Sequence, residues 1–263
     1  MSNHKTRLTL AILNIIGYVG VLVVNFLANA IPIGGKNTGE LSDQYPNLFV
    51  PAGLTFSIWG VIFLLLGIFV VYSLVYTLQN RNLTTDTFLD KIGYWFFVSC
   101  LANMSWIFAW HYEILPLSLV LMLVILASLI AIYQRQKIGI SSVSNTEKYL
   151  THLPFSIYLG WITVATIANI TALLVNAGVG GLGIGEAPWA VIVIIVSIGI
   201  GLTMIFNRRD VFYGLTVAWA LLGIYIKRSN APDVIQSVVI VSIAGVVLLL
   251  LADIVQIFRR KVY

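Results

Sequence analysis

Residues 152–177 read HLPFSIYLGWITVATIANITALLVNA, a stretch that contains no Asp, Glu, Lys or Arg. As an α-helix it would extend about 39 Å at about 1.5 Å per residue, enough to cross the roughly 30 Å hydrocarbon core of a bilayer. Trp161 lies near its middle, although tryptophan in membrane proteins is usually found at the interface with water. The stretch therefore predicts a membrane-spanning helix that carries an aromatic side chain at depth.

The rest of the chain has the composition of such helices. Of its 263 residues, 59% are hydrophobic and 10% are charged, whereas a soluble domain carries about 25% charged residues. The apolar segments cover residues 8–31, 52–78, 92–112, 114–133, 152–177, 188–206, 211–226 and 235–258. We therefore predict an all-α fold, a polytopic membrane helix bundle of eight helices, in which 211–226 is short for a span.

Two connections between the predicted helices differ from the others. Residues 178–188 read GVGGLGIGEAP, which is typical of a flexible connection. It predicts a five-helix unit over residues 1–177 and a three-helix transmembrane extension over residues 178–263. Residues 32–50 are rich in Gly, Pro, Asn and Asp, and we expect this loop to fold over an outward-facing opening.

Lys and Arg are distributed unequally between the two ends of the predicted helices. With the N-terminus inside, 12 of them lie on the inner side, including Arg260 and Lys261, while Lys36, Lys227 and Arg228 lie on the outer side. This positive-inside bias predicts a multi-pass protein of the cell membrane with cytoplasmic N- and C-termini. The net charge of +5 thus reflects orientation, and no nucleic acid partner is expected. The first apolar stretch, about 20 residues, exceeds the usual 7–15 of a signal peptide and is read as a retained helix.

Polar and aromatic residues gather on one face of each of four predicted helices, because spacings of three and four residues share a helical face. These faces carry Asn14, Tyr18, Asn25 and Asn29 in 8–31; Phe56, Trp59, Phe63 and Gly67 in 52–78; Ser99, Asn103, Trp106 and Trp110 in 92–112; and Tyr158, Trp161, Ala165 and Asn169 in 152–177. We predict a cavity between these four helices, open to the outer side beneath the 32–50 loop, with Tyr158 and Trp161 as its floor.

A ligand-binding role is predicted for ten residues of these faces: Asn25, Phe56, Trp59, Asn103, Trp106, Trp110, Tyr158, Trp161, Ala165 and Asn169. Rings stack on a flat apolar ligand while amides fix its orientation. The alternative is that the rings only pack and the amides only join neighbouring helices, at about 0.6 kcal/mol for each hydrogen bond.

Other kinds of site find less support in the sequence. No ionisable residue lies deep in a predicted span, as ion-coupled transport usually requires. Asp253 lies near the inner end of its helix, where we expect it to snorkel or to pair locally. The three histidines are scattered, and no nucleophile has an adjacent base. We therefore expect neither a metal site nor an enzyme.

Three motifs resemble those of the translocator protein family, the tryptophan-rich sensory proteins (TspO/MBR). Trp161, Ala165 and Asn169 are similar to the family's W-x3-A-x3-N stripe, and Asn103 with Trp106 resembles its N-x2-W segment. The run from Pro51 to Trp59 resembles its proline-to-tryptophan motif. The resemblance covers about residues 8–177 and implies a five-helix unit whose first loop caps a pocket. It implies pocket roles for Trp59, Asn103, Trp106, Trp161, Ala165 and Asn169.

The chain also departs from the family pattern. Val50 and Gly53 stand where the family usually has a second proline and a further tryptophan. Phe56 lies one residue later than the corresponding position of the family motif. Pro154 lies farther before Trp161 than the family's proline normally does. With three extra C-terminal helices, this chain is similar to a long, divergent member. The changed motif before Trp59 leaves the identity of the ligand open.

The resemblance implies that the chain binds a flat hydrophobic ligand, such as a porphyrin or haem, with no obligatory cofactor, and forms a homodimer in the lipid bilayer. Because the aromatic faces hold no fixed charge, a porphyrin's carboxylates would have to reach the outer loop near Lys36. Our first hypothesis is a sensor or regulator that binds such a hydrophobic small molecule. The alternatives are an uncoupled transporter or facilitator, an intramembrane enzyme, and a membrane scaffold without ligand.

Overall fold

The structure is a computed structural model that describes residues 4–259. Its long helices are α1 (His4–Ala30), α3 (Ile58–Gln79), α5 (Trp95–His111), α6 (Leu115–Gln136), α8 (Leu153–Asn176), α9 (Glu186–Arg208), α10 (Val211–Ser229) and α11 (Gln236–Phe258). Its short elements are η1 (Ile33–Gly35), α2 (Thr38–Asp43), η2 (Gly53–Ser57), α4 (Phe88–Ile92), α7 (Asn145–Glu147), η3 (Lys148–His152) and η4 (Gly180–Gly183). No strand occurs within 4–259, which confirms the all-α prediction. Arg260 and Lys261, used above for orientation, lie outside the described residues.

Seven helical segments of the described chain are long and apolar enough to cross a membrane. The predicted short helix 211–226 is among them, because it continues to Ser229 as α10. The long helix that is not among them is α5, which has 17 residues. A polytopic membrane bundle is therefore confirmed, while an eighth crossing by α5 stays a prediction.

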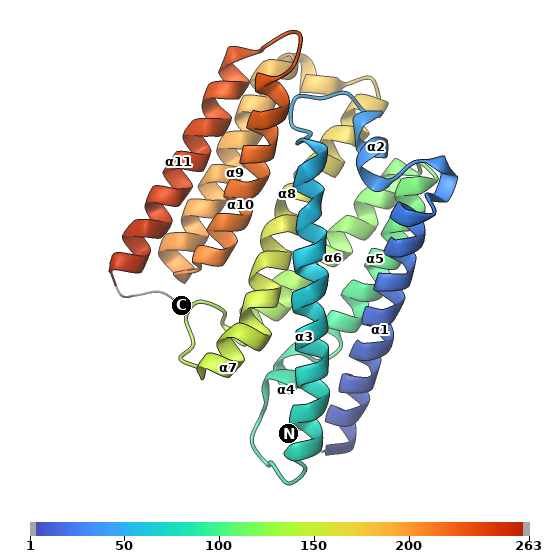
Figure 1. The fold of residues 1–263 in the computed structure, drawn as a ribbon, viewed down its shortest axis with the longest axis vertical. Coiled ribbons are helices and arrows are strands. Elements are labelled where there is room, and N and C mark those ends of the chain that lie inside the picture. Colours follow the sequence, from blue (N-terminus) through green and yellow to red (C-terminus); the bar gives the residue numbers. More distant parts are fainter. Residues whose placement is uncertain (1–3, 260–263) are drawn as a thin grey trace.

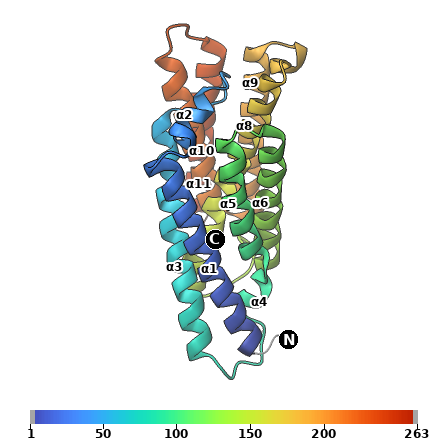
Figure 2. The same cartoon turned by 90° about the vertical axis from the view of Figure 1, so that its right-hand side faces the viewer.

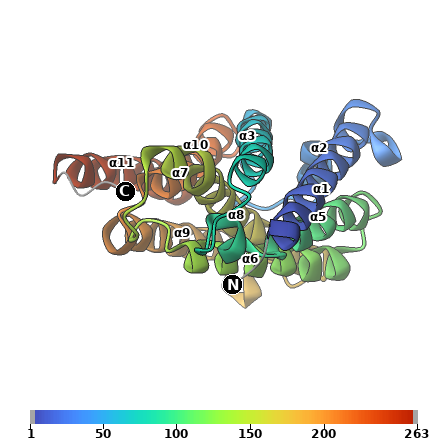
Figure 3. The same cartoon turned by 90° about the horizontal axis from the view of Figure 1, so that it is seen from below.

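Helix α8 lies at the centre of the bundle (Figure 1), where it packs against α3, α6 and α10. Helix α1 packs against α3 and α5, and α5 packs against α6. Helices α9, α10 and α11 lie beside this group as a second set (Figures 1 and 3). The 32–50 loop, with α2, lies at the same end of the bundle as the turn between α8 and α9 (Figures 1 and 2).

The prediction of a continuous helix over 92–112 was wrong at its start. Helix α4 ends at Ile92, Gly93 adopts a φ of 56°, and α5 begins at Trp95. The break lies at Gly93, whose positive φ is non-helical and is a conformation that glycine adopts easily. The buried Arg7 of α1 donates from Nε to both oxygens of Asp90, at 3.2 and 2.9 Å. Its guanidinium also donates to two carbonyls of the 80–87 loop. These bonds hold α4 against α1.

Candidate functional site

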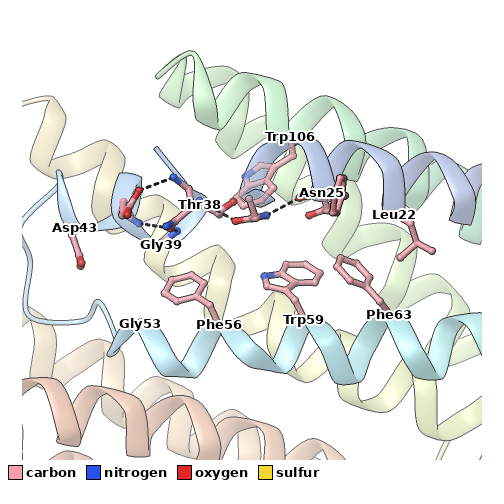
Figure 4. A pocket seen from close by; sticks show the side chains of 14 residues that line it. Leu22, Asn25, Thr38, Gly39, Asp43, Gly53, Phe56, Trp59, Phe63 and Trp106 are labelled. Atoms are coloured by element: carbon pink, nitrogen blue, oxygen red, sulfur yellow. Dashed lines mark hydrogen bonds between the residues drawn. The ribbon is translucent and has the colours of Figure 1, made fainter. Parts of the chain in front are cut away.

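A cavity of about 670 Å³ lies between α1, α3 and α5, with α2 as its cover (Figure 4). Its lining residues are Leu22, Asn25, Phe26, Asn29, Asn37, Thr38, Gly39, Glu40, Asp43, Gly53, Phe56, Trp59, Phe63 and Trp106. Figure 4 shows the rings of Phe56, Trp59 and Phe63 in a row along the η2–α3 segment, facing Asn25 and Trp106 across the space. The cavity lies beneath the 32–50 loop and between three of the four helices whose faces were predicted to enclose it; no residue of the fourth, α8, is among its lining residues.

A smaller cavity, about 50 Å³, adjoins the first and reaches α6 and α8. The two cavities share Thr38, Phe56, Trp59 and Trp106. The smaller one is also lined by Ser42, Pro51, Trp110, Met122, Trp161, Val164, Ala165, Ala168 and Asn169. Eight of the ten predicted site residues therefore line one cavity or the other, and the remaining two, Asn103 and Tyr158, are buried beside them.

The aromatic side chains form a box around the junction of the two cavities. The Trp161 ring meets Phe56 and Trp59 edge to face, with ring centroids 5.9 and 6.3 Å apart. Trp59 also touches the ring of Tyr158 at 6.0 Å. Trp106 stacks on Trp110 at 5.8 Å, with an angle of 17° between the rings. These are favourable geometries for aromatic pairs, so the box is packed before any ligand is present.

A chain of hydrogen bonds joins three helices below the box. Asn25 Nδ2 on α1 donates to Asn103 Oδ1 on α5 at 3.0 Å, and Asn103 Nδ2 donates to the Tyr158 hydroxyl on α8 at 3.5 Å. Asn25 Nδ2 also donates to the Val21 carbonyl at 2.9 Å. All three side chains are buried. The amides of Asn25 and Asn103 thus have the helix-joining role given above as the alternative.

Three polar atoms of the cavity walls lack a partner. The indole N–H groups of Trp106 and Trp161 have no hydrogen-bond acceptor among the described residues, although both side chains are at least nine-tenths buried. Asn169 donates to Ser118 Oγ at 2.7 Å, but its Oδ1 accepts nothing within the described chain. A buried unpaired polar group costs about 1–3 kcal/mol. These three atoms are therefore the buried polar atoms of the cavity walls that the described chain leaves unpaired.

The cover of the cavity is fixed to α5 by two side chains. Trp110 Nε1 donates to the Thr38 carbonyl at 3.3 Å, and His111 Nδ1 lies 2.8 Å from the Ile33 carbonyl. With the proton on Nδ1, His111 Nε2 accepts from the Thr38 hydroxyl at 3.3 Å. Sequence reasoning missed this role of His111. The signal available was its place at the end of the Trp106 and Trp110 face.

Another part of the loop is fixed through Tyr45. Its hydroxyl donates to the Glu113 carboxylate at 3.0 Å, and its ring meets Trp110 with centroids 5.8 Å apart. Burial raises the pKa of Tyr45 to about 12, and the hydrogen bond to Glu113 adds to the shift. Tyr45 is therefore a neutral hydrogen-bond donor at physiological pH.

Helix α10 also contacts the loop that leads into the cavity. Gly223 O accepts from the Ala52 amide, and Trp219 Nε1 donates to the Thr55 carbonyl, both at 3.0 Å. Arg228 donates to the Asn47 carbonyl at 2.7 Å. Trp219 and Gly223 are not lining residues of either cavity. The second set of helices thus supports the cavity wall from behind.

The expectation that Asp253 snorkels or pairs locally was wrong. Its side chain is 3% exposed and its carboxylate oxygens have no hydrogen-bond partner among the described residues. Gly214 of α10 allows this, since a Cβ there would lie 2.8 Å from Asp253 Oδ1. The nearby Asp210 is also buried and accepts from Tyr133 and Ser156 hydroxyls at 2.7–2.8 Å. Burial raises the pKa of Asp210, against the effect of these hydrogen bonds.

The charged residues that line the large cavity are Glu40 and Asp43, both on α2. Lys36, expected to meet a porphyrin's carboxylates, is exposed and is not a lining residue. Among residues 4–259 no group of three or more His, Cys, Asp or Glu could hold a metal ion. The site is therefore an aromatic cavity with an acidic cover.

Fold and site together define a class, the multi-pass helical membrane proteins with an aromatic cavity beneath their first long loop. The model of a family described as "TSPO-like protein" matches residues 11–255, and the chain belongs to this family. The match continues past residue 177 through α9 and α10, so the division into 1–177 and 178–263 stays a prediction. No curated protein and no solved structure matched the chain.

Proposed function

We propose that this protein binds a flat, largely apolar ligand of the porphyrin or tetrapyrrole type and acts as a membrane sensor or regulator. The observation that carries the proposal is the aromatic box whose two buried indole N–H groups, on Trp106 and Trp161, have no acceptor among the described residues. A ligand with a carbonyl or ring nitrogen would accept from them while its rings lie against Phe56 and Trp59.

The dimensions of the site suit this kind of ligand. Small-molecule sites enclose about 300–1,000 Å³ and combine apolar walls with a few polar groups, and the large cavity encloses about 670 Å³. Its ionisable lining residues, Glu40 and Asp43, are both on the cover, α2. This arrangement favours binding over catalysis, and we propose that the protein is not an enzyme.

The proposal includes an orientation in the cell membrane. With cytoplasmic N- and C-termini, the cavity lies in the outer half of the bilayer and opens outward beneath the 32–50 loop. The partners proposed are the hydrophobic small molecule, the lipid bilayer and a second copy in a homodimer, with no nucleic acid.

A second candidate function, transport of a small hydrophobic solute, is favoured by Asp253. The sequence suggested no ionisable residue deep in the bundle, yet this carboxyl is buried in α11 beside Gly214. Buried ionisable residues in membrane helices commonly mark transport pathways. Transport predicts solute flux in proteoliposomes that falls in Asp253→Asn, whereas a sensor would give no flux in either protein.

The test of binding is a titration of the purified protein in detergent with protoporphyrin IX dimethyl ester, followed by tryptophan fluorescence. Because both carboxylates of this ligand are esterified and uncharged, its binding reports on the ring system. We expect saturable quenching in the wild type and weaker binding in Trp161→Ala and Asn169→Leu. Trp189→Phe is the control, since it removes a tryptophan that lines neither cavity. Linear quenching that is alike in all four proteins would refute the proposed site.

A further inference from the structure

We propose that the cavity selects a flat ligand whose outward-facing end is cationic, such as an amine or ammonium group, and rejects one with free carboxylates there. This inference rests on the proposed function, because it specifies the ligand of the same cavity. It follows from the charges on α2 and from the rings beside them.

The two cavities have an uneven charge distribution. Their lining residues include Glu40 and Asp43 but no Lys, Arg or His. Asp43 forms an ion pair with Lys227 of α10, so its charge is offset. Glu40 accepts from the backbone amide of Asn37 at 2.8 Å, and a neutral amide leaves the carboxylate charge in place. The uncompensated charge on the cavity cover is therefore that of Glu40.

Aromatic side chains line the same cavity as this carboxylate. Phe56 and Trp59 are half-buried and line the cavity with Glu40. Gly39, which precedes Glu40 on α2, lies against Phe56, since a Cβ there would be 3.7 Å from Phe56 Cδ2. Cations bind favourably over aromatic faces. A ligand cation in this cavity would therefore gain from a negative charge on the cover and from ring faces in the wall.

A ligand carboxylate in the same place meets the opposite situation. The carboxylate would lose hydration in a site where the nearby groups are the negative Glu40 and ring faces that are negative at their centres. Desolvation and like charge both disfavour its ionised form. The nearest basic residue in sequence, Lys36, does not line the cavity. The charge that the sequence suggested for holding a porphyrin's carboxylates is therefore not in position to do so.

The experiment compares three derivatives of one ring system in the binding assay: protoporphyrin IX, its dimethyl ester and its bis(2-aminoethyl) amide. They share the macrocycle and differ in the charge of their side chains. We expect the diamide to bind about three- to tenfold more tightly than the ester, as cation–π and exposed ion-pair energies allow. The free acid should bind more weakly than the ester.

Two matched variants assign the effect to one residue. Glu40→Gln keeps the capping box of α2, since Gln serves at this position as well as Glu. It should remove most of the affinity advantage that the diamide has over the ester. Glu186→Gln makes the same charge change at the start of α9, at a residue that lines neither cavity, and should change neither affinity.

The outcomes separate the two proposals. If the free acid binds as tightly as the ester, or if Glu40→Gln leaves the diamide's affinity unchanged, the charge selection is wrong while the binding site stands. If the ester itself shows no saturable binding, the proposed function fails, and the charge selection fails with it. Added salt should weaken diamide binding and leave ester binding unaffected.

Discussion

At the scale of single residues, Asn103 shows how a polar side chain can serve packing and site at once. It is fully buried and connects Asn25 of α1 with Tyr158 of α8. Tyr158 in turn contacts the ring of Trp59 in the aromatic box. The position of the box thus depends on a hydrogen-bonded amide that does not itself line either cavity.

Replacing this amide tests that dependence. Asn103→Leu removes two hydrogen bonds, the one that Asn103 accepts from Asn25 Nδ2 and the one that it donates to the Tyr158 hydroxyl. Asn25 Nδ2 keeps its bond to the Val21 carbonyl. We expect a loss of about 1–2 kcal/mol in unfolding free energy, because the partner atoms stay buried. The measurement is denaturant unfolding in detergent. The control is Tyr158→Phe, which removes only the 3.5 Å bond and should lower the unfolding free energy by less. An equal loss in the two variants would contradict the larger role given to Asn103.

Sequence reasoning placed most of the cavity residues correctly because they share helical faces. Trp161, Ala165 and Asn169, four residues apart, do line one cavity. What periodicity cannot give is the partner of each polar atom. For that reason the contact of His111 with the Ile33 carbonyl was missed, and the expectation for Asp253, which is buried against Gly214, was wrong. Ligand binding by the ten residues remains a prediction.

At the scale of elements, hydrophobicity predicted where the long helices lie but not every boundary. Helix α8 was expected over 152–177 and extends over Leu153–Asn176. The start of α5 could not be predicted in this way, because hydrophobicity does not show that Gly93 leaves the helical conformation. Nor does it show that Arg7 holds Asp90 of α4, 83 residues away.

The contact between α10 and the η2 segment gives a test at this scale. A Cβ at Gly223 would lie 1.9 Å from Thr55 Oγ1 and 2.9 Å from Thr55 Cβ, so Gly223→Ala forces the two elements apart. We expect a loss of about 1–3 kcal/mol in unfolding free energy, as for other overpacked sites, and weaker binding in the cavity. Gly199→Ala, in α9, adds a methyl group where nothing lies within 4 Å and should be neutral or slightly stabilising. Equal stability of the two variants would contradict the close packing.

At the scale of the whole molecule, α10 is bonded to the loop that covers the cavity. Residues 47–55 bond to α10 through Arg228, Gly223 and Trp219. These contacts join segments more than 160 residues apart in sequence. Sequence reasoning treated the last three helices as an addition, because periodicity contains no information on such distant contacts.

Hydrogen exchange measures how strongly α10 holds the loop. Arg228→Gln removes charged donors to the Asn47 and Val50 carbonyls. A hydrogen bond to a charged group contributes about 1.5–3 kcal/mol, so we expect amide exchange over residues 45–52 to accelerate by about tenfold or more. Lys227→Gln is the matched control, because its ion pair with Asp43 is largely exposed and should contribute little. Similar acceleration in both variants would contradict a specific role for Arg228.

The short α5 has a consequence for the surrounding lipid. Its 17 residues rise about 26 Å, several ångströms less than an average hydrocarbon core. Exposed aromatic rings mark both ends, Tyr94 and Trp95 at one and Tyr112 at the other, as is typical of the membrane–water interface. If α5 crosses the membrane as predicted, it would match a thin bilayer and be strained in a thick one. Because Trp106 and Trp110 are on this helix, acyl-chain length would then act on the cavity through its wall.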